Sequence, residues 1–336
     1  MTWPAPIAEL EPTIVFESYW KFISARFEIY LKRLRGESPP WTADPVLSRY
    51  KFTNVFRATD RVSQEGIRIS LDPISAASLE EQFFRIILFK LFNKIETWTA
   101  LTEALGEEPR LRNFGFSHYC EVFEELMRKG TKIYSAAYMM PCPADYGVAG
   151  ITRKHAMHLN MLEEMLATGI AHKLKEAGNL EGAYGVLRKV RMFGNFTAYQ
   201  FTIDVNYGPF LGYNENEFII PGPGAEEGIE KCFRNPEKVS KTEIIERVTD
   251  YQNACAFAIT GAFAPTLFGR SLQLIDIQNC FCEIAKYSRV AHPEFNTDRT
   301  RIKHGYNPSW FRPLPEPVFP VQWGIGLPAA TAGVNG

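Results

Sequence analysis

The sequence lacks several features that would assign a function at once. Its 336 residues carry a formal net charge of −1, so no global positive field favours a polyanion, and nucleic-acid contact would need a local basic patch. The six cysteines show no regular spacing, which predicts reduced thiols rather than a disulfide framework, and no zinc-ligand pattern is present. No run of about 18 uninterrupted apolar residues occurs, so we expect no transmembrane helix.

Catalytic signatures are equally scarce. The chain contains no Walker A loop, no dinucleotide-binding glycine fingerprint, no G-x-S-x-G elbow and no H-E-x-x-H pair. Phosphoryl transfer through a P-loop of this chain is therefore not expected, and neither is a cofactor or a metal. The first residues lack the basic region and apolar run of a signal peptide, so we expect a soluble, intracellular protein of the cytoplasm or nucleus.

Helical periodicity is the dominant pattern that is present. Apolar residues recur every three or four positions, and Ser78 with Glu81 three residues later predicts a capped helix start. We predict a mainly α, multi-helix single domain over residues 1–306, followed by a proline-rich tail over residues 307–336 that is extended on the surface or disordered. The strongest helical segments are residues 13–36, 78–101, 117–130, 152–178, 241–260 and 271–290.

The first candidate site lies in "YKFTNVFRATDRVSQEGIRIS", residues 50–70. On one helix, its polar residues at steps of three or four would form a basic stripe able to bind phosphates through guanidinium groups. A solvated helix face with an Arg–Asp pair explains the same pattern. The residues concerned are Asn54, Arg57, Asp60, Arg61, Gln64 and Arg68.

The second candidate lies in "RKVRMFGNFTAYQFTIDVNYG", residues 188–208. A glycine before a Thr-Ala pair has the form of a helix-hairpin-helix unit, whose backbone N–H groups and helix N-terminus hold one DNA phosphate. An αα-hairpin with a glycine corner fits as well. The residues are Gly194 for the corner, Lys189 and Arg191 for charge, Thr197 at the helix start, and Gln200 and Asp204 on one face of the helix.

Two further segments attract attention. "PGPGAEEG", with Gly222 and Gly224, is no nucleotide loop, because it lacks both the required spacing and a following lysine. In "DIQNCFCEIAKYSR", Glu283 and Lys286 are three residues apart on a predicted helix, where they form either part of a polar site or an ordinary ion pair.

Four segments of the sequence together resemble the helical domain found with 5-hydroxymethyl-deoxyuridine (5-hmdU) DNA kinases, a family also described as α-glutamyl/putrescinyl-thymine pyrophosphorylases. These segments are "FTNVFRATDRVSQE", "FGNFTAYQFTIDVNY", "NENEFIIPGPGAEEGI" and "CEIAKYSR". The resemblance implies an all-helical module acting on or beside modified thymine in DNA. The second motif is also similar to helix-hairpin-helix DNA glycosylases. It lacks their catalytic Asp, and Phe196 stands where a Schiff-base Lys would be, so the resemblance extends to the fold and not to base excision.

These observations leave three hypotheses. In the first, the chain is a base-modifying enzyme that displaces (pyro)phosphate from an activated 5-substituted pyrimidine in DNA. In the second, it is a non-catalytic DNA-binding module that positions a separate kinase or TET/JBP-type dioxygenase. In the third, it is a helical scaffold without a nucleic-acid partner. For the enzyme, we expect catalytic roles for Arg57, Asp60, Arg61, Asp204, Glu283 and Lys286. We expect DNA-binding roles for Asn54, Arg68, Lys189, Arg191, Gly194, Thr197, Gln200, Gly222 and Gly224.

Overall fold

The structure, a computed structural model, describes residues 3–135, 140–307 and 312–325. This part of the chain contains α- and 3₁₀-helices and no strand, only three isolated bridges, which confirms the prediction of a mainly α fold. The chain divides into two compact units, here called unit 1 and unit 2. The predicted domain of residues 1–306 includes residues of both, and its boundary stays a prediction.

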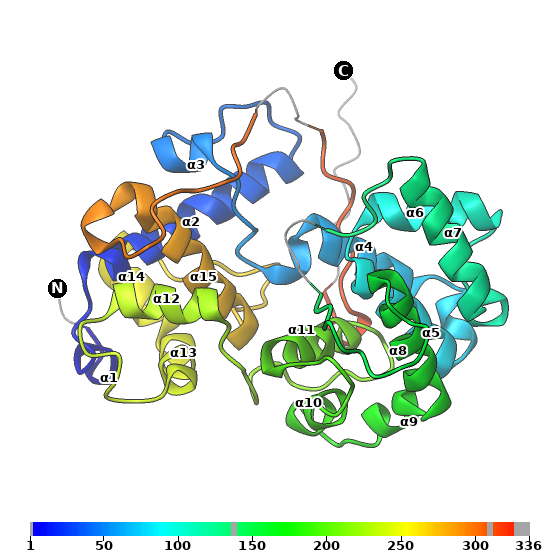
Figure 1. Ribbon diagram of the computed structural model, residues 1–336. Coiled ribbons are helices and arrows are strands. Elements are labelled where there is room, and N and C mark those ends of the chain that lie inside the picture. The colour runs from blue at the N-terminus through cyan, green and yellow to red at the C-terminus, as the bar shows by residue number, and fades with distance from the viewer. Residues whose placement is uncertain (1–2, 136–139, 308–311, 326–336) are drawn as a thin grey trace. The chain divides into compact units, whose positions relative to one another are not determined.

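Unit 1 combines the start of the chain, up to Asp60, with residues 219–317. Its long second helix begins at Thr13, whose hydroxyl accepts a hydrogen bond from Val15 N (3.1 Å) and so satisfies a free N–H of the first turn. In Figure 1, α12 runs alongside α15, the helix that it contacts most extensively. The helices of unit 1 are α1 (Ala5–Ala8), α2 (Ile14–Leu34), α3 (Pro45–Arg49), η1 (Arg57–Thr59), α12 (Pro223–Cys232), α13 (Lys241–Asp250), α14 (Gln252–Thr260), α15 (Leu274–Ala291) and η4 (Pro293–Phe295).

Unit 2 is built around α5, which is buried on all sides from Gln82 onward. The Ser78 hydroxyl accepts from Glu81 N (3.1 Å), so the predicted cap at the start of this helix is confirmed. The helices of unit 2 are α4 (Arg61–Leu71), η2 (Ser75–Ala77), α5 (Leu79–Phe92), α6 (Ile95–Leu105), η3 (Leu111–Asn113), α7 (Phe116–Arg128), α8 (Lys154–Ala167), α9 (Ile170–Lys175), α10 (Leu180–Leu187), α11 (Asn195–Asn206) and η6 (Val321–Trp323).

The tail contributes residues 318–323 to unit 2. The Gln64 side chain binds the main chain of Val318 twice, donating to its carbonyl (2.8 Å) and accepting from its N–H (2.9 Å). Gln322 donates to Asn206 O (2.7 Å), and the Phe319 side chain is buried. This part of the tail is therefore packed in place, while residues 308–311 and 326–336 lie outside the described residues.

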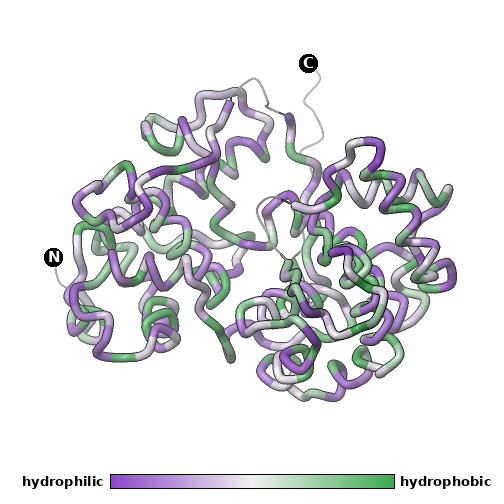
Figure 2. Tube along the Cα trace, in the orientation of Figure 1, coloured by the Kyte–Doolittle hydropathy of each residue, from purple (hydrophilic) through white to green (hydrophobic). Residues whose placement is uncertain are grey.

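Hydrophilic and hydrophobic residues alternate along most helices of both units, as Figure 2 shows, which is the pattern of helices that bury one face. Among the described residues, no helix combines the length and the apolar character needed to cross a membrane.

Candidate functional site

The segment of residues 50–70 is a loop followed by a helix, so the single basic stripe predicted for it is wrong. The helix begins only at Arg61, because the polar side chains before it bind the local main chain instead. Asn54 N donates to Asp60 Oδ1 (2.7 Å), and Asn54 Nδ2 donates to Thr59 O (2.8 Å). These bonds close a tight loop of residues 54–60.

The arginines of the predicted stripe consequently have different surroundings. Arg57 is buried in unit 1, and its main-chain N–H donates to Asp276 Oδ1 (2.8 Å). Arg61 is exposed in unit 2 and pairs with Glu96 (2.8 Å), while Arg68 lies 3.9 Å from Glu65 on the same helix.

In unit 1 the first and last motifs come together. α15 presents Asp276 and Glu283, two turns apart on one face, toward the loop of residues 51–60, which we call the polar loop. Glu283 Oε2 accepts from Thr53 N (3.3 Å) and also pairs with Lys286. The sequence singled out Asn54, Asp60, Glu283 and Lys286 in two separate motifs, and the structure brings these motifs together.

A third element completes this cluster. Arg26 of α2 is buried and donates through Nη2 to Asn54 Oδ1 (2.6 Å) and to Phe52 O (3.1 Å). Sequence reasoning missed Arg26, although a single arginine on the apolar face of a helix is a signal for a buried polar partner. Together, Arg26, Asn54, Asp60 and Glu283 form what we call the buried polar cluster.

The electrostatics of the cluster favour proton exchange at Asp60. Burial raises the pKa of Asp60 to about 7, against the opposing effects of the Asn54 N–H and the Arg26 charge. Burial also lowers the pKa of Arg26 to about 10, although the nearby Asp60 carboxylate favours the charged form. A carboxyl group that titrates near neutral pH can take up or release a proton during a reaction.

The segment "PGPGAEEG" has a packing role in α12. A Cβ atom on Gly228 would lie 2.0 Å from Phe281 O of α15, and one on Gly224 would lie 2.5 Å from Cys282 Sγ. Gly222 is the N-cap residue of the helix. Helix contact thus explains two of these glycines without a ligand, and the DNA-binding roles of Gly222 and Gly224 stay predictions.

In unit 2 the predicted hairpin is present as α10, a turn and α11, but Gly194 is not its corner. The left-handed residue is Met192 (φ 68°), whereas Gly194 has an extended backbone (φ −74°, ψ 173°) and caps α11. The chain turns early because Phe193 is drawn into the core against Phe201 (ring centroids 4.5 Å apart). Arg188 closes the turn by donating to Phe193 O (2.9 Å).

The two basic side chains of the hairpin, Lys189 and Arg191, differ in their contacts with the rest of unit 2. Lys189 is exposed and forms no ion pair within the described part of the chain. Arg191 donates to Tyr146 O (2.8 Å) and lies 3.6 Å from Glu164. Thr197 is half-buried in the first turn of α11, and a Cβ on Gly194 would meet no atom within 4 Å.

The polar residues of α11 point inward rather than to solvent. Gln200 is buried, and Asp204 forms a largely buried ion pair with Lys90 of α5 (2.5 Å). Sequence reasoning missed Lys90, whose signal is a lone lysine within the apolar run "IILFKLF". A paired charge at this depth holds α5 and α11 together.

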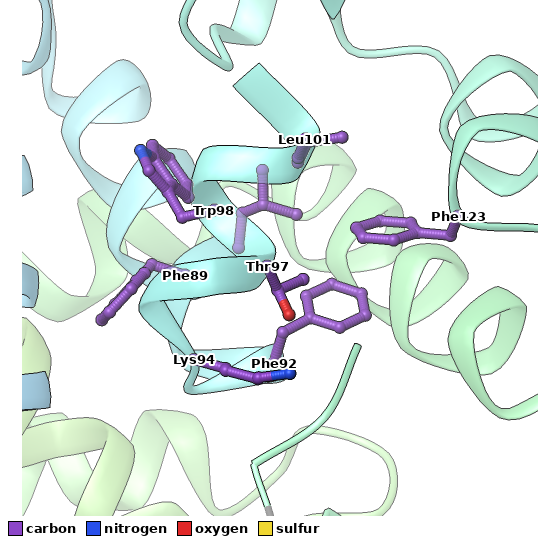
Figure 3. Close-up of a pocket in the computed structure, with 8 residues that line it drawn as sticks. Phe89, Phe92, Lys94, Thr97, Trp98, Leu101 and Phe123 are labelled. Atoms are coloured by element: carbon purple, nitrogen blue, oxygen red, sulfur yellow. The ribbon is translucent and has the colours of Figure 1, made fainter. Parts of the chain in front are cut away.

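A small apolar pocket also lies in unit 2, between α5, α6 and α7 (Figure 3). Phe92 and Phe123 both line it and stack on each other, with ring centroids 4.3 Å apart. It has room for about one water molecule and includes none of the predicted site residues. The pocket is therefore too small for a nucleobase. No group of three or more metal-ligating side chains occurs among the described residues.

Comparison of the chain with known proteins identifies a family. A family model described as the helical domain of 5-hmdU DNA kinase matches residues 13–297. The 5-hmdU DNA kinase of Bacillus phage SP10 is 23% identical over 288 residues, a match that covers 81% of this chain and 45% of the relative. The chain therefore spans less than half the length of that relative. No solved structure matches it.

Proposed function

Because this chain belongs to the family of the 5-hmdU DNA kinase helical domain, we propose that it is a DNA-binding helical protein of thymine or 5-hydroxymethyluracil hypermodification. The observation that carries the proposal is the buried polar cluster. It combines a carboxyl group of pKa about 7 with a buried guanidinium, at the meeting point of two sequence motifs.

The proposed reaction replaces a phosphate or pyrophosphate on the 5-methylene group of an activated pyrimidine with an amine. The C–O bond breaks, and the leaving group departs with its electron pair while the C–N bond forms. The proton lost by the amine passes to Asp60. Glu283 is a second acceptor in the same cluster. The catalytic roles expected for Arg57, Arg61, Asp204 and Lys286 stay predictions from the sequence.

Duplex DNA would be held at the hairpin between α10 and α11, as in helix-hairpin-helix proteins. The exposed Lys189 and the unobstructed backbone at Gly194 support this mode of binding, because a phosphate needs charge and access to main-chain N–H groups. Asn54 and Gln200, which are both buried, are weaker candidates for direct contact with DNA than the sequence alone indicated.

A second candidate function is a non-catalytic module that positions a separate kinase or dioxygenase on DNA. The observation that favours it is the coverage of the phage relative. Less than half of that relative matches this chain, so in that protein the domain operates beside other sequence.

The test is mass spectrometry of nucleosides from duplexes containing 5-hydroxymethyluracil or its phosphorylated form, after incubation with the chain and candidate amines. We expect a new nucleoside with the wild type and with the exposed-site control Asp298→Asn, and its loss with Asp60→Asn. DNA binding without any new nucleoside would favour the non-catalytic module. Binding that resists added salt would contradict both DNA hypotheses. Equal binding by Lys189→Gln and the control Lys173→Gln would place the DNA away from the hairpin.

A further inference from the structure

One face of α2 carries polar atoms that are buried and yet have no hydrogen-bond partner among the described residues. They are Arg26 Nη1, Tyr30 Oη and Arg33 Nε, and Tyr306 Oη from the segment after α15 is a fourth. The three helical residues follow each other at i, i+4 and i+7, so they share one face. Buried polar atoms of folded proteins are nearly always paired, and each exception asks for an explanation.

Other contacts hold these side chains in place without using the free atoms. The Arg33 guanidinium lies over the Trp41 ring (5.4 Å), and Trp41 in turn contacts the Tyr306 ring (centroids 5.9 Å apart). Main-chain bonds fix Tyr306, whose N–H donates to Arg49 O (2.8 Å). The free donors are therefore preorganised, and a ligand would not have to order them.

All four atoms serve as hydrogen-bond donors. Guanidinium nitrogens have no acceptor capacity, and burial raises the pKa of Tyr30 to about 12, so its hydroxyl stays protonated. Burial raises the pKa of Tyr306 in the same way. Two guanidinium groups beside two protonated hydroxyls can all donate to the same partner, which makes the cluster complementary to an oxyanion.

The charges place the anion toward the C-terminal part of this face. Arg26 has the Asp60 and Glu283 carboxylates nearby, whereas Arg33 has no carboxylate within ion-pair distance among the described residues. Arg33 and Tyr306 are also partly exposed, which gives a ligand access from that end, while Tyr30 is 3% exposed.

We infer that Tyr30, Arg33 and Tyr306, with Arg26 at the inner end, form a binding site for a phosphate group. The site lies within unit 1 and requires neither the hairpin nor a catalytic role for Asp60. Two sources have the right chemistry, free inorganic phosphate and a phosphate of nucleic acid. Only the second rests on the proposed function.

The test measures the melting temperature of the full chain with inorganic phosphate against chloride at equal ionic strength, together with calorimetric titration. We expect phosphate to raise the melting temperature, because a ligand that binds only the folded state stabilises it. Arg33→Gln should weaken phosphate binding by about tenfold or more, which corresponds to a lost charge-assisted hydrogen bond. Arg35→Gln, on the same helix but exposed and paired with Glu28 and Glu37, should bind like the wild type.

Tyr30→Phe keeps the test decisive if the arginine variant folds poorly. Without phosphate it should be as stable as the wild type or more so, because it removes an unpaired buried hydroxyl, yet it should bind phosphate less tightly. An equal effect of phosphate and chloride, or wild-type phosphate binding by Arg33→Gln and Tyr30→Phe, would overturn the inference.

An unmodified duplex that competes with phosphate would identify nucleic acid as the source, and lack of competition would identify free phosphate. If phosphate raises the melting temperature but no modified nucleoside is formed in the mass-spectrometry test, the proposed function is contradicted and the phosphate site is not.

Discussion

At the scale of single residues, three buried or partly buried carboxylates of unit 1 accept hydrogen bonds from main-chain N–H groups of the polar loop. Asp60 accepts from Asn54 N, Asp276 from Arg57 N, and Glu283 from Thr53 N. Each bond fixes the loop at a different residue, so its conformation depends on three separate acidic side chains. Burial nevertheless outweighs these bonds at two of them, because it raises the pKa of Asp276 to about 6 and that of Asp60 to about 7.

The raised pKa of Asp60 predicts how its replacement changes stability with pH. Between its ordinary pKa of about 4 and its folded value of about 7, the folded state binds the proton more tightly than the unfolded state. The contribution of Asp60 to stability is therefore full below pH 4 and is lost as the pH rises through 7. Asp60→Asn should raise the free energy of unfolding by about 1–3 kcal/mol at pH 8, with the difference shrinking toward pH 4.

Urea denaturation at a series of pH values measures this difference. Asp298→Asn, at an exposed position, should follow the wild type across the range. A difference that stays constant from pH 4 to pH 8, or a variant less stable at pH 8, would contradict the assignment of a raised pKa to Asp60.

At the scale of elements, close contact between α12 and α15 depends on Gly228. An added Cβ atom would meet the main-chain oxygen of Phe281, which cannot rotate away. Gly228→Ala should therefore lower the free energy of unfolding by at least about 2 kcal/mol, in spite of the better helix propensity of alanine. Gly185→Ala in α10 meets no atom within 4 Å and should be neutral or stabilising by up to about 1 kcal/mol. Equal melting temperatures for the two variants would show that the helices separate without cost.

The hairpin allows a prediction about binding rather than stability. Gly194 has an ordinary φ and open space around its Cβ position, so Gly194→Ala should cost no more than about 1 kcal/mol of stability, because alanine is a poorer N-cap residue than glycine. If a DNA phosphate approaches this backbone, the added methyl group should weaken duplex binding by about threefold to tenfold, or about 1 kcal/mol. Fluorescence anisotropy at fixed salt measures the affinity. An unchanged affinity would place the DNA elsewhere on the chain.

The sequence predicted the elements better than the site. Periodicity and the Ser78 cap identified α5, whereas nothing in the sequence indicated that the motif of residues 50–70 lies against the helix of Glu283. Asn54, Arg57 and Arg61 have the spacing of one helix face, but no helix contains all three. The spacing of residues does not show whether their side chains bind the local main chain, as those of Asn54 and Asp60 do. The polar contacts of Arg26 and Lys90 were not predicted for a related reason. Their partners, Asn54 and Asp204, are far away in sequence, and only the tertiary structure brings them together.

At the scale of the whole molecule, unit 2 depends on a segment near the end of the chain. Deletion of residues 318–336 would remove both Val318 bonds to Gln64, the Gln322 bond to Asn206, and the buried Phe319 side chain. The loss should cost about 2–4 kcal/mol and speed amide hydrogen exchange in α4 and α11. Mass spectrometry of hydrogen exchange measures the effect.

An exposed position in the same segment gives the control for this prediction. Val321→Ala, at a residue that is 61% exposed, should leave exchange in α4 and α11 at the wild-type rate. Wild-type exchange in the deletion variant would show that residues 318–323 contribute nothing to unit 2.

The division of unit 1 between the two ends of the chain has a consequence for its synthesis on the ribosome. α2 leaves the ribosome early, but its partners α12 and α15 follow only after all of residues 61–218. At about 5–20 residues per second, the apolar face of α2 waits on the order of ten to thirty seconds for its cover. Unit 2 has most of its residues available during that interval and can fold first. The apolar face of α2 is thus uncovered during synthesis until the second part of unit 1 has been made.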